Sequence, residues 1–196
     1  MNLQLFELLN HLAGRYRGVD DVMEFLAQWL IYVVFAVAAI LAGRALRRRE
    51  LAALLQVAVA LLIAYGTAVG LSAISHELRP FQTHAVTVLI PHAGGVSMPS
   101  DHAVAAFTVA FAVTAFLHRR WGPVLTVAAL AIGVARVWVG VHYPDDILVG
   151  AMIAALSVLE VGVWTRWRPQ PSSALFSARS QPRAPTVRRG IAHGER

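Results

Sequence analysis

The stretch Arg136-Val-Trp-Val-Gly-Val-His142-Tyr-Pro-Asp-Asp146 joins two apolar runs, residues 122–139 and 146–164. Each run is close to the roughly 20 residues that a helix needs to cross a bilayer. Proline suits a first helical turn, so Pro144 marks the start of the second helix. Ionisable groups at membrane depth are costly and normally persist because they bind or react with something. The stretch therefore predicts a membrane hairpin with a polar site at its turn.

The composition places the whole chain in the membrane class. Of its 196 residues 57% are hydrophobic and 14% charged, with a mean hydropathy of +0.59, whereas soluble domains are about a quarter charged. The length suggests one domain. The lack of cysteine excludes disulfides and thiolate zinc sites. The net charge of +6 comes from arginines that adjoin apolar runs, which favours a role in membrane topology over a nucleic-acid partner.

Hydropathy predicts an all-α fold, a polytopic membrane helix bundle of about five transmembrane helices. The candidate spans are residues 22–43, 51–74, 99–117, 122–139 and 146–164. Apolar residues at threefold spacing near the amino terminus predict an additional amphipathic helix at the membrane interface: Leu3, Phe6, Leu9 and Leu12. Residues 1–165 would form the membrane domain, and the Arg-, Pro- and Ser-rich residues 166–196 a disordered cytoplasmic tail.

The arginines predict the orientation of the bundle. Most of them lie in two connections between spans and in the tail: Arg44, Arg47, Arg48, Arg49, Arg119, Arg120, Arg166, Arg168, Arg179, Arg183, Arg188, Arg189 and Arg196. Positive residues favour the cytoplasmic side of a membrane. With five spans the amino terminus then lies outside. The polar motifs would share the outer face of the cell membrane.

A second motif, Pro99-Ser100-Asp101-His102, opens the third span. The free N–H groups of a helix start bind anions, and the hydroxyl of Ser100 adds a donor. His102, one turn into the helix, is placed to protonate a departing oxygen. The alternative is an ordinary helix entry, in which Asp101 favours the positive end of the helix dipole.

The four-residue step from His142 to Asp146 lets the carboxylate accept a hydrogen bond from the imidazole. That contact would stabilise the cation formed when the other ring nitrogen attacks phosphorus. Arg79 and Arg136 supply guanidiniums, which hold phosphoryl oxygens in pairs. The simpler interpretation makes Arg79 an interfacial anchor and Arg136 a snorkelling side chain.

Two further histidines, His84 and His92, lie between the motifs. Either could touch a diphosphate, but we interpret both as loop residues. A shortage of clustered carboxylates gives no sign of a metal site.

Together the segments resemble the signature of the type 2 phosphatidic acid phosphatase family, which ends in Ser-Arg-x5-His-x3-Asp. The longer run from Arg79-Pro80 through residues 89–92 to residues 97–103 resembles the bacitracin-resistance-type undecaprenyl-diphosphate phosphatases of that family. The resemblance covers roughly residues 70–150. Three positions depart from the family pattern. Ser72 stands where lysine is frequent, Ala135 where serine is usual, and Asp101 where many members have glycine.

The resemblance implies an enzyme that hydrolyses undecaprenyl diphosphate to undecaprenyl phosphate and inorganic phosphate, which supports recycling of the cell-wall lipid carrier and bacitracin resistance. His142 would be the nucleophile that forms a phosphohistidine, Asp146 its orienting partner and His102 the general acid. The residues that hold the phosphate would be Arg79, Ser100, Asp101 and Arg136. No metal or other cofactor is implied. The partners would be the polyprenyl diphosphate substrate and the bilayer.

Two alternatives stay open at this point. The chain could be a phosphatase of other lipids, such as phosphatidate, phosphatidylglycerol phosphate or lipid A. It could also be a non-catalytic transporter whose arginines bind anionic headgroups. A binding protein would tolerate glutamine at His142, whereas an enzyme that needs a nucleophile there would not.

Overall fold

The computed structural model describes residues 2–167, and the chain up to Arg166 forms one compact unit. Apart from its first two residues, the predicted tail lies outside the described residues, so its disorder stays a prediction. Within the described part the regular secondary structure is all helical, apart from an isolated bridge between Leu78 and Val96. The elements are α1 (Asn2–Asn10), α2 (Arg17–Gln28), α3 (Leu30–Arg47), α4 (Leu51–Ile74), α5 (Pro80–Thr83), α6 (Asp101–Ala112), the π-helical η1 (Val113–Leu117), α7 (Gly122–Trp138) and α8 (Pro144–Trp167).

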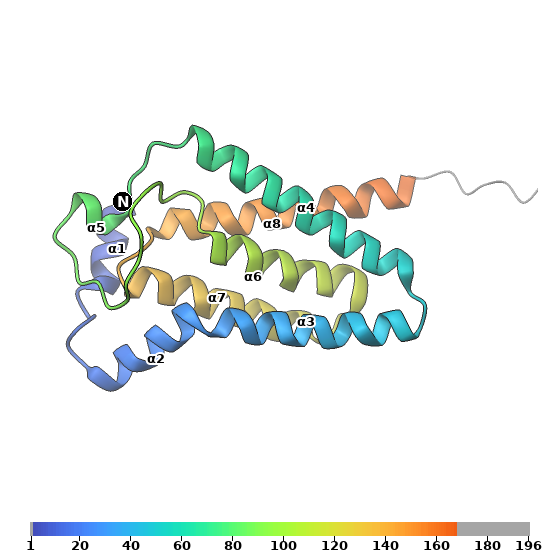
Figure 1. Cartoon of the computed structure of the whole chain (residues 1–196), viewed down its shortest axis with the longest axis horizontal. Helices are drawn as coiled ribbons and strands as arrows, with labels where there is room; N and C mark the ends of the chain where they lie inside the picture. Colours follow the sequence, from blue (N-terminus) through green and yellow to red (C-terminus); the bar gives the residue numbers. More distant parts are fainter. Residues whose placement is uncertain (1, 168–196) are drawn as a thin grey trace, which may run out of the picture. The chain divides into compact units, whose positions relative to one another are not determined.

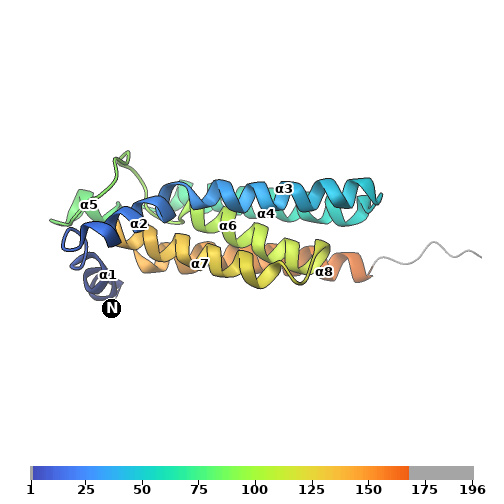
Figure 2. The same ribbon diagram turned by 90° about the horizontal axis from the view of Figure 1, so that it is seen from below.

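Helices α3, α4, α6, α7 and α8 run side by side as a bundle, with α6 in contact with α3, α4 and α7 (Figures 1 and 2). The buried face of α6 is rich in small side chains, among them Ala103, Ala106 and Ala110. Small residues let helix backbones approach closely, which drives packing in membranes where lipid is as apolar as leucine. The all-α polytopic bundle predicted from hydropathy is confirmed.

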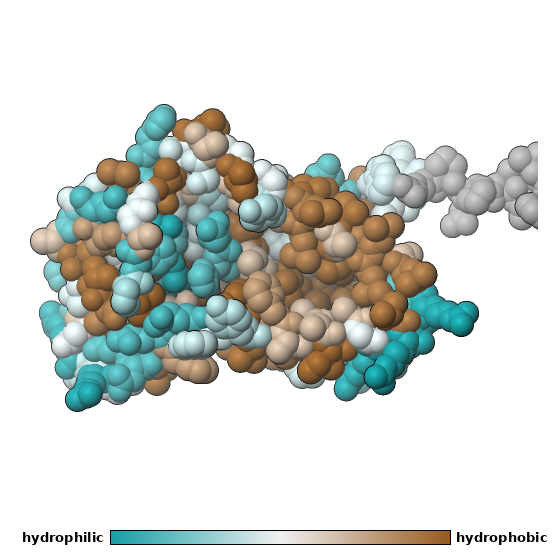
Figure 3. Space-filling model, in the orientation of Figure 1, coloured by the Kyte–Doolittle hydropathy of each residue, from teal (hydrophilic) through white to brown (hydrophobic). Residues whose placement is uncertain are grey.

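The exterior of the bundle is apolar. Three helices are long and apolar enough to cross a membrane, namely α3, α4 and α8, and the shorter apolar segments 101–117 and 122–138 lie between them. Leu62, Leu148 and Leu156 each expose more than half of their surface. In Figure 3 an apolar band separates hydrophilic ends. Helices satisfy their own backbone hydrogen bonds, so this exterior suits lipid. The chain is a multi-pass membrane protein.

The first span differs from its prediction. Residues 22–43 were expected to form one helix, but α2 ends at Gln28 and α3 begins at Leu30. The last carbonyls of a helix have no partner within it, and the carbonyl of Ala27 accepts a hydrogen bond from Arg136 Nη1 at 3.5 Å. The break therefore gives the buried guanidinium of Arg136 a partner. Hydropathy could not reveal it, because the apolar residues continue through Trp29.

The amino-terminal helix α1 packs on the bundle with one face. Phe6 is fully buried against Val137 and Tyr143. The Nδ2 of Asn10 donates to the carbonyl oxygens of Thr87 (2.8 Å) and Trp138 (2.9 Å), and its Oδ1 accepts from the backbone N–H of Thr87 at 3.0 Å. This single side chain therefore fastens α1 to the end of α7 and to the loop that follows α5.

Candidate active site

The polar segments singled out in the sequence meet at one end of the bundle. α4 ends there at Ile74 and α7 at Trp138, while α6 begins at Asp101 and α8 at Pro144. The connection from α4 to α6, which carries α5, lies at the same end (Figure 1). The up-and-down order of the helices therefore brings residues from three separate parts of the sequence into one site.

His142 lies at the centre of this site and is only 2% exposed. Its Nδ1 is 3.1 Å from Asp146 Oδ2, and its Nε2 is 3.0 Å from Arg79 Nη1. A guanidinium can only donate, so Nε2 must accept and the ring proton must reside on Nδ1. This tautomer leaves a lone pair on Nε2, the form that a nucleophilic imidazole requires.

Asp146 is fully buried, and its Oδ2 orients the ring of His142. Besides His142, Oδ2 accepts hydrogen bonds from Ser97 Oγ at 2.5 Å and from the backbone N–H of Tyr143 at 2.8 Å. Ser97 was not predicted as a site residue. It lies in a loop without periodicity, and its contact with Asp146 joins positions 49 residues apart. The order of the sequence gives no signal for such a contact.

Burial lowers the pKa of His142 from its ordinary 6.5 to about 4, and the charges of Arg136 and Arg79 act in the same direction. The hydrogen bond with Asp146 raises the pKa but does not outweigh burial. His142 is therefore neutral at physiological pH. The lone pair on Nε2 is available without the prior removal of a proton.

Several buried donors next to this ring have no partner of their own. Ser100 is fully buried at the amino-terminal cap of α6, yet its hydroxyl makes no hydrogen bond. The Nε atoms of Arg79 and Arg136 are buried and unpaired as well. Buried polar groups are normally satisfied, so donors left unpaired in this way point to a ligand. Together with the N–H groups at the start of α6 these donors are suited to hold an anion, and we call the set the anion cradle.

His92 belongs to the site, although its sequence context favoured an ordinary loop position. Its Nδ1 lies 3.0 Å from the carbonyl of Ala93, and its Nε2 lies 2.7 Å from Arg136 Nη2. Burial lowers the pKa of His92, partly opposed by the bond to Ala93, so the ring is a neutral acceptor for Arg136. The ring centroids of His92 and His142 are 6.2 Å apart. His84, by contrast, contacts Thr83 and Tyr143.

His102 and Asp101 occupy the first turn of α6 beside the cradle. His102 is half-buried, and Arg136 and Arg79 are near enough for their charges to act on it. Asp101 is exposed and interacts electrostatically with Arg79 and Arg136. A carboxylate repels phosphoryl oxygens, so Asp101 suits contact with the two guanidiniums better than contact with a phosphate.

Close backbone approaches hold these segments in place. Gly140 has φ +84°, and a Cβ there would collide with the carbonyl oxygen of Thr87. Gly150 of α8 faces Ala103 of α6, where an added Cβ would come within 2.9 Å of the alanine side chain. The first contact shapes the turn that carries His142. The second lets the start of α6 approach α8.

One group of carboxylates in the described part of the chain has the spacing of metal ligands. Glu77, Asp145 and Asp146 each offer an oxygen, and these oxygens lie within 4.8 Å of one another. Burial, with the nearby charges of Asp145 and Asp146, raises the pKa of Glu77. A proton shared among the carboxylates would relieve their repulsion without a cation.

The sequence matches the PAP2 superfamily over residues 53–170. It is 30% identical over 166 residues to the bacitracin transport permease protein BcrC of Bacillus licheniformis, covering 84% of this chain and 80% of that protein. It is 33% identical over 161 residues to the undecaprenyl-diphosphatase BcrC of Bacillus subtilis strain 168, covering 81% and 80%. The crystal structure of LpxE from Aquifex aeolicus is similar, with a TM-score of 0.68 and 26% identity, over 82% of this chain and 93% of that one. From the match over more than half of its length and the likeness to these relatives, it follows that the chain belongs to the PAP2 superfamily.

Proposed function

We propose that this phosphatase hydrolyses undecaprenyl diphosphate to undecaprenyl phosphate and inorganic phosphate through a phosphohistidine at His142. One observation carries the proposal. The neutral imidazole of His142 is fixed by Asp146, and its Nε2 carries a lone pair that accepts a hydrogen bond from Arg79 Nη1. Buried donors without a partner lie on Arg79, Ser100 and Arg136. A nucleophile next to several donors without a protein partner suits attack on a phosphoryl group. The name of the Bacillus subtilis relative supports the substrate.

In the first step Arg79 Nη1 leaves Nε2 of His142 for a phosphoryl oxygen. Nε2 then attacks the terminal phosphorus, and the bond from phosphorus to the bridging oxygen breaks. The negative phosphates of the bound substrate favour a protonated His102, which donates its proton to that oxygen, so undecaprenyl phosphate leaves. Asp146 stabilises the positive charge on the ring through the Nδ1 proton. Arg79, Ser100 and Arg136 hold the phosphoryl oxygens. These side chains supply the proton transfer and the charge stabilisation of the step.

In the second step water attacks the phosphohistidine, and the bond between phosphorus and Nε2 breaks. His102, now deprotonated, accepts a proton from the water. Inorganic phosphate leaves, and Nε2 regains its lone pair. The contact between Arg79 Nη1 and Nε2, 3.0 Å long in the structure, then re-forms.

Trapping of the covalent intermediate tests the mechanism directly. Purified protein is mixed with substrate labelled in its terminal phosphate and quenched rapidly. We expect acid-labile, alkali-stable label on His142. The His142→Gln variant should carry none and turn over at least about a thousandfold more slowly. His84→Gln, which alters a histidine outside the cradle, is the matched control and should behave like the wild type. Near-normal activity of His142→Gln would refute the mechanism.

The same variants separate the enzyme from a transporter, a class to which the name of the Bacillus licheniformis relative points. A transporter uses His142 at most as a binding group, so glutamine would preserve most of its function. Bacitracin resistance conferred in cells by the His142→Gln variant would favour transport. Loss of resistance together with loss of phosphate release would favour hydrolysis.

The second enzymatic candidate is a phosphatase of another lipid, and one observation favours keeping it. Ser100, Arg79 and Arg136 each carry a buried donor without a partner, a set that suits the one phosphate of another lipid substrate. We assign the second phosphate of a diphosphate to the guanidinium of Arg136, which His92 positions through a contact of 2.7 Å. We therefore expect a higher kcat/KM for undecaprenyl diphosphate than for phosphatidate in the same detergent. His92→Ala should bring the two kcat/KM values closer together. An equal or reversed preference in the wild type would reject the diphosphate assignment and leave the phosphatase intact.

A further inference from the structure

A groove lies at the opposite end of the bundle from His142, where η1, α4 and α8 meet. Its volume is about 630 Å³. Arg119, in the connection after η1, and Arg166, in the last turn of α8, both line it. Thr114 and Thr165 add hydroxyl oxygens to the same wall. Two cations from separate segments therefore share one concave surface.

The rest of the groove is apolar. Phe116, Leu159 and Val163 contribute side chains, and Gly162 leaves room between them. A Cβ at Gly162 would lie 4.0 Å from Phe116 Cε1, which is ordinary contact distance. The groove thus combines a cationic mouth with an apolar wall. That combination matches an amphiphile with a negative headgroup and a hydrocarbon chain.

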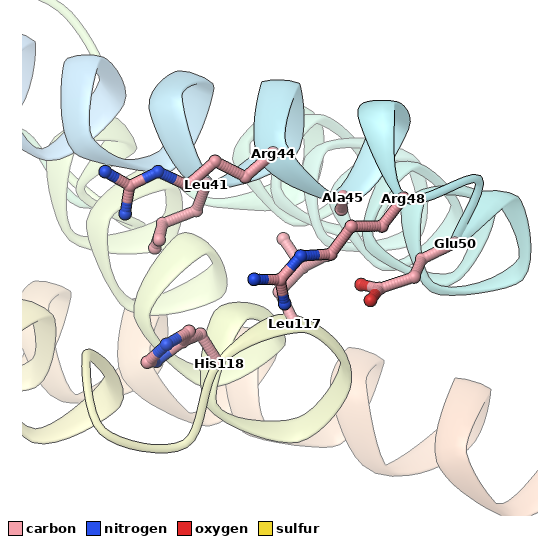
Figure 4. A pocket seen from close by; sticks show the side chains of 7 residues that line it. All are labelled: Leu41, Arg44, Ala45, Arg48, Glu50, Leu117 and His118. Carbon is pink, nitrogen blue, oxygen red and sulfur yellow. The ribbon is translucent and has the colours of Figure 1, made fainter.

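The arginines of this groove differ from others at the same end. Arg44 and Arg48 line a smaller cavity of about 70 Å³ together with His118, and the side chain of Glu50 points towards Arg48 there (Figure 4). Among the described residues that line the larger groove, none is acidic. The carboxylate of Glu50 offsets part of the positive charge in the small cavity. The larger groove is therefore the stronger attractor of an anion.

We propose that this groove binds an anionic glycerophospholipid, with its phosphate between Arg119 and Arg166 and an acyl chain against Phe116. Helices α4 and α8 are long enough to cross the bilayer, so the groove lies at the membrane interface opposite the site of His142. Basic pockets between helices at such an interface bind anionic headgroups. The site is separate from the proposed catalytic one, and its existence does not depend on the substrate.

Arg119 and Arg166 could instead serve only to orient the protein in the membrane, but that role explains less of the geometry than lipid binding does. Such a role requires only that they lie on one side of the membrane, and it does not require them to line an apolar groove. The sequence after residue 167 contains six arginines and one glutamate, so charge disfavours that segment as the occupant. A lipid of the surrounding leaflet meets both the charge and the shape.

The test measures lipid-dependent stabilisation of the full chain in detergent micelles that contain phosphatidylglycerol or phosphatidylcholine. We expect Tm to rise with the concentration of phosphatidylglycerol and to reach a plateau. Phosphatidylcholine should change Tm little. In Arg119→Gln and Arg166→Gln the apparent affinity should fall about fivefold for each arginine removed. The matched control is Arg120→Gln, which removes the neighbouring charge but does not line the groove, and its affinity should stay within about twofold of the wild type.

Two further arms separate a lipid groove from general charge attraction. Gly162→Leu keeps both arginines but fills the apolar wall, so it should also weaken phosphatidylglycerol binding. Glycerol phosphate without acyl chains should give no stabilisation at the same concentration. Equal losses in Arg120→Gln and Arg119→Gln would overturn the proposal, as would equal stabilisation by phosphatidylcholine or by glycerol phosphate. Phosphate release at His142 reports on the other end of the molecule and should persist in all of these variants.

Discussion

At the scale of single residues, the chemistry of the site depends on how His142 is held. Asp146 fixes one nitrogen, and the carboxylate is itself fixed by Ser97 and by the N–H of Tyr143. The spacing of His142 and Asp146 in the sequence predicted the first contact, because four residues along a turn bring the two groups together. Sequence spacing could not predict the contacts of Ser97 and His92. Their contacts depend on the path of a loop, which has no periodicity to read.

The variant Ser97→Ala tests whether the hydrogen bond from Ser97 helps Asp146 to position His142. Loss of a hydrogen bond to a buried charged group costs about 1.5–3 kcal/mol, so kcat should fall about tenfold or more. KM should change little, because Ser97 acts on substrate only through Asp146. Ser157→Ala is the matched control, since Ser157 is also buried but donates to the carbonyl of Ile153 in α8. If KM rose about tenfold at constant kcat, Ser97 would instead bind substrate.

The lowered pKa of His142 predicts a dependence of stability on pH. The unfolded chain binds this proton near pH 6.5, whereas the folded chain binds it only near pH 4. The unfolded state therefore holds more protons between these values, and stability must fall as pH drops through this window. His92 shifts in the same direction and adds to the effect. Thermal unfolding in detergent across that window should show a shallower slope for His142→Gln than for wild type, and an unchanged slope would contradict the buried, neutral imidazole.

At the scale of elements, the prediction succeeded where a long apolar run contains no charged residue. The span at residues 51–74 coincides with α4, because a run without charged residues is bounded by Glu50 on one side and Ser75 on the other. The first span failed because a helix can end inside an apolar run when a tertiary partner takes up the freed carbonyl. That partner, Arg136, lies 109 residues further along the chain from Ala27. The sequence around Ala27 therefore gives no sign of this contact.

The turn between α7 and α8 yields a prediction at this scale. In Gly140→Ala the new Cβ would meet the carbonyl oxygen of Thr87 and impose a positive φ on alanine. A left-handed conformation alone costs about 1–2 kcal/mol, and the displaced turn carries His142. We expect a lower Tm and a lower kcat. Gly18→Ala in α2 is the control, since nothing lies within 4 Å of its added Cβ. Wild-type behaviour of Gly140→Ala would show that the turn is more plastic than its geometry indicates.

At the scale of the whole molecule, the distribution of arginines predicts that the site faces the cell exterior. Because the chain lacks cysteine, single cysteines can be introduced on a clean background. Ala93→Cys, at an exposed position next to His92, should react with an impermeant maleimide in intact cells. Arg120→Cys should react only after the membrane is permeabilised. The reverse pattern would invert the topology and place the site on the cytoplasmic side.

The attachment of α1 also bears on the order in which the protein is made. Asn10 bonds to Thr87 and to Trp138, which are 77 and 128 residues away. During synthesis neither partner exists when α1 leaves the ribosome, and the second appears only once α7 has been translated. The hairpins of the membrane bundle can assemble one after another as they emerge, but α1 must wait. Helix α1 can thus complete these contacts only after both partner segments have been made.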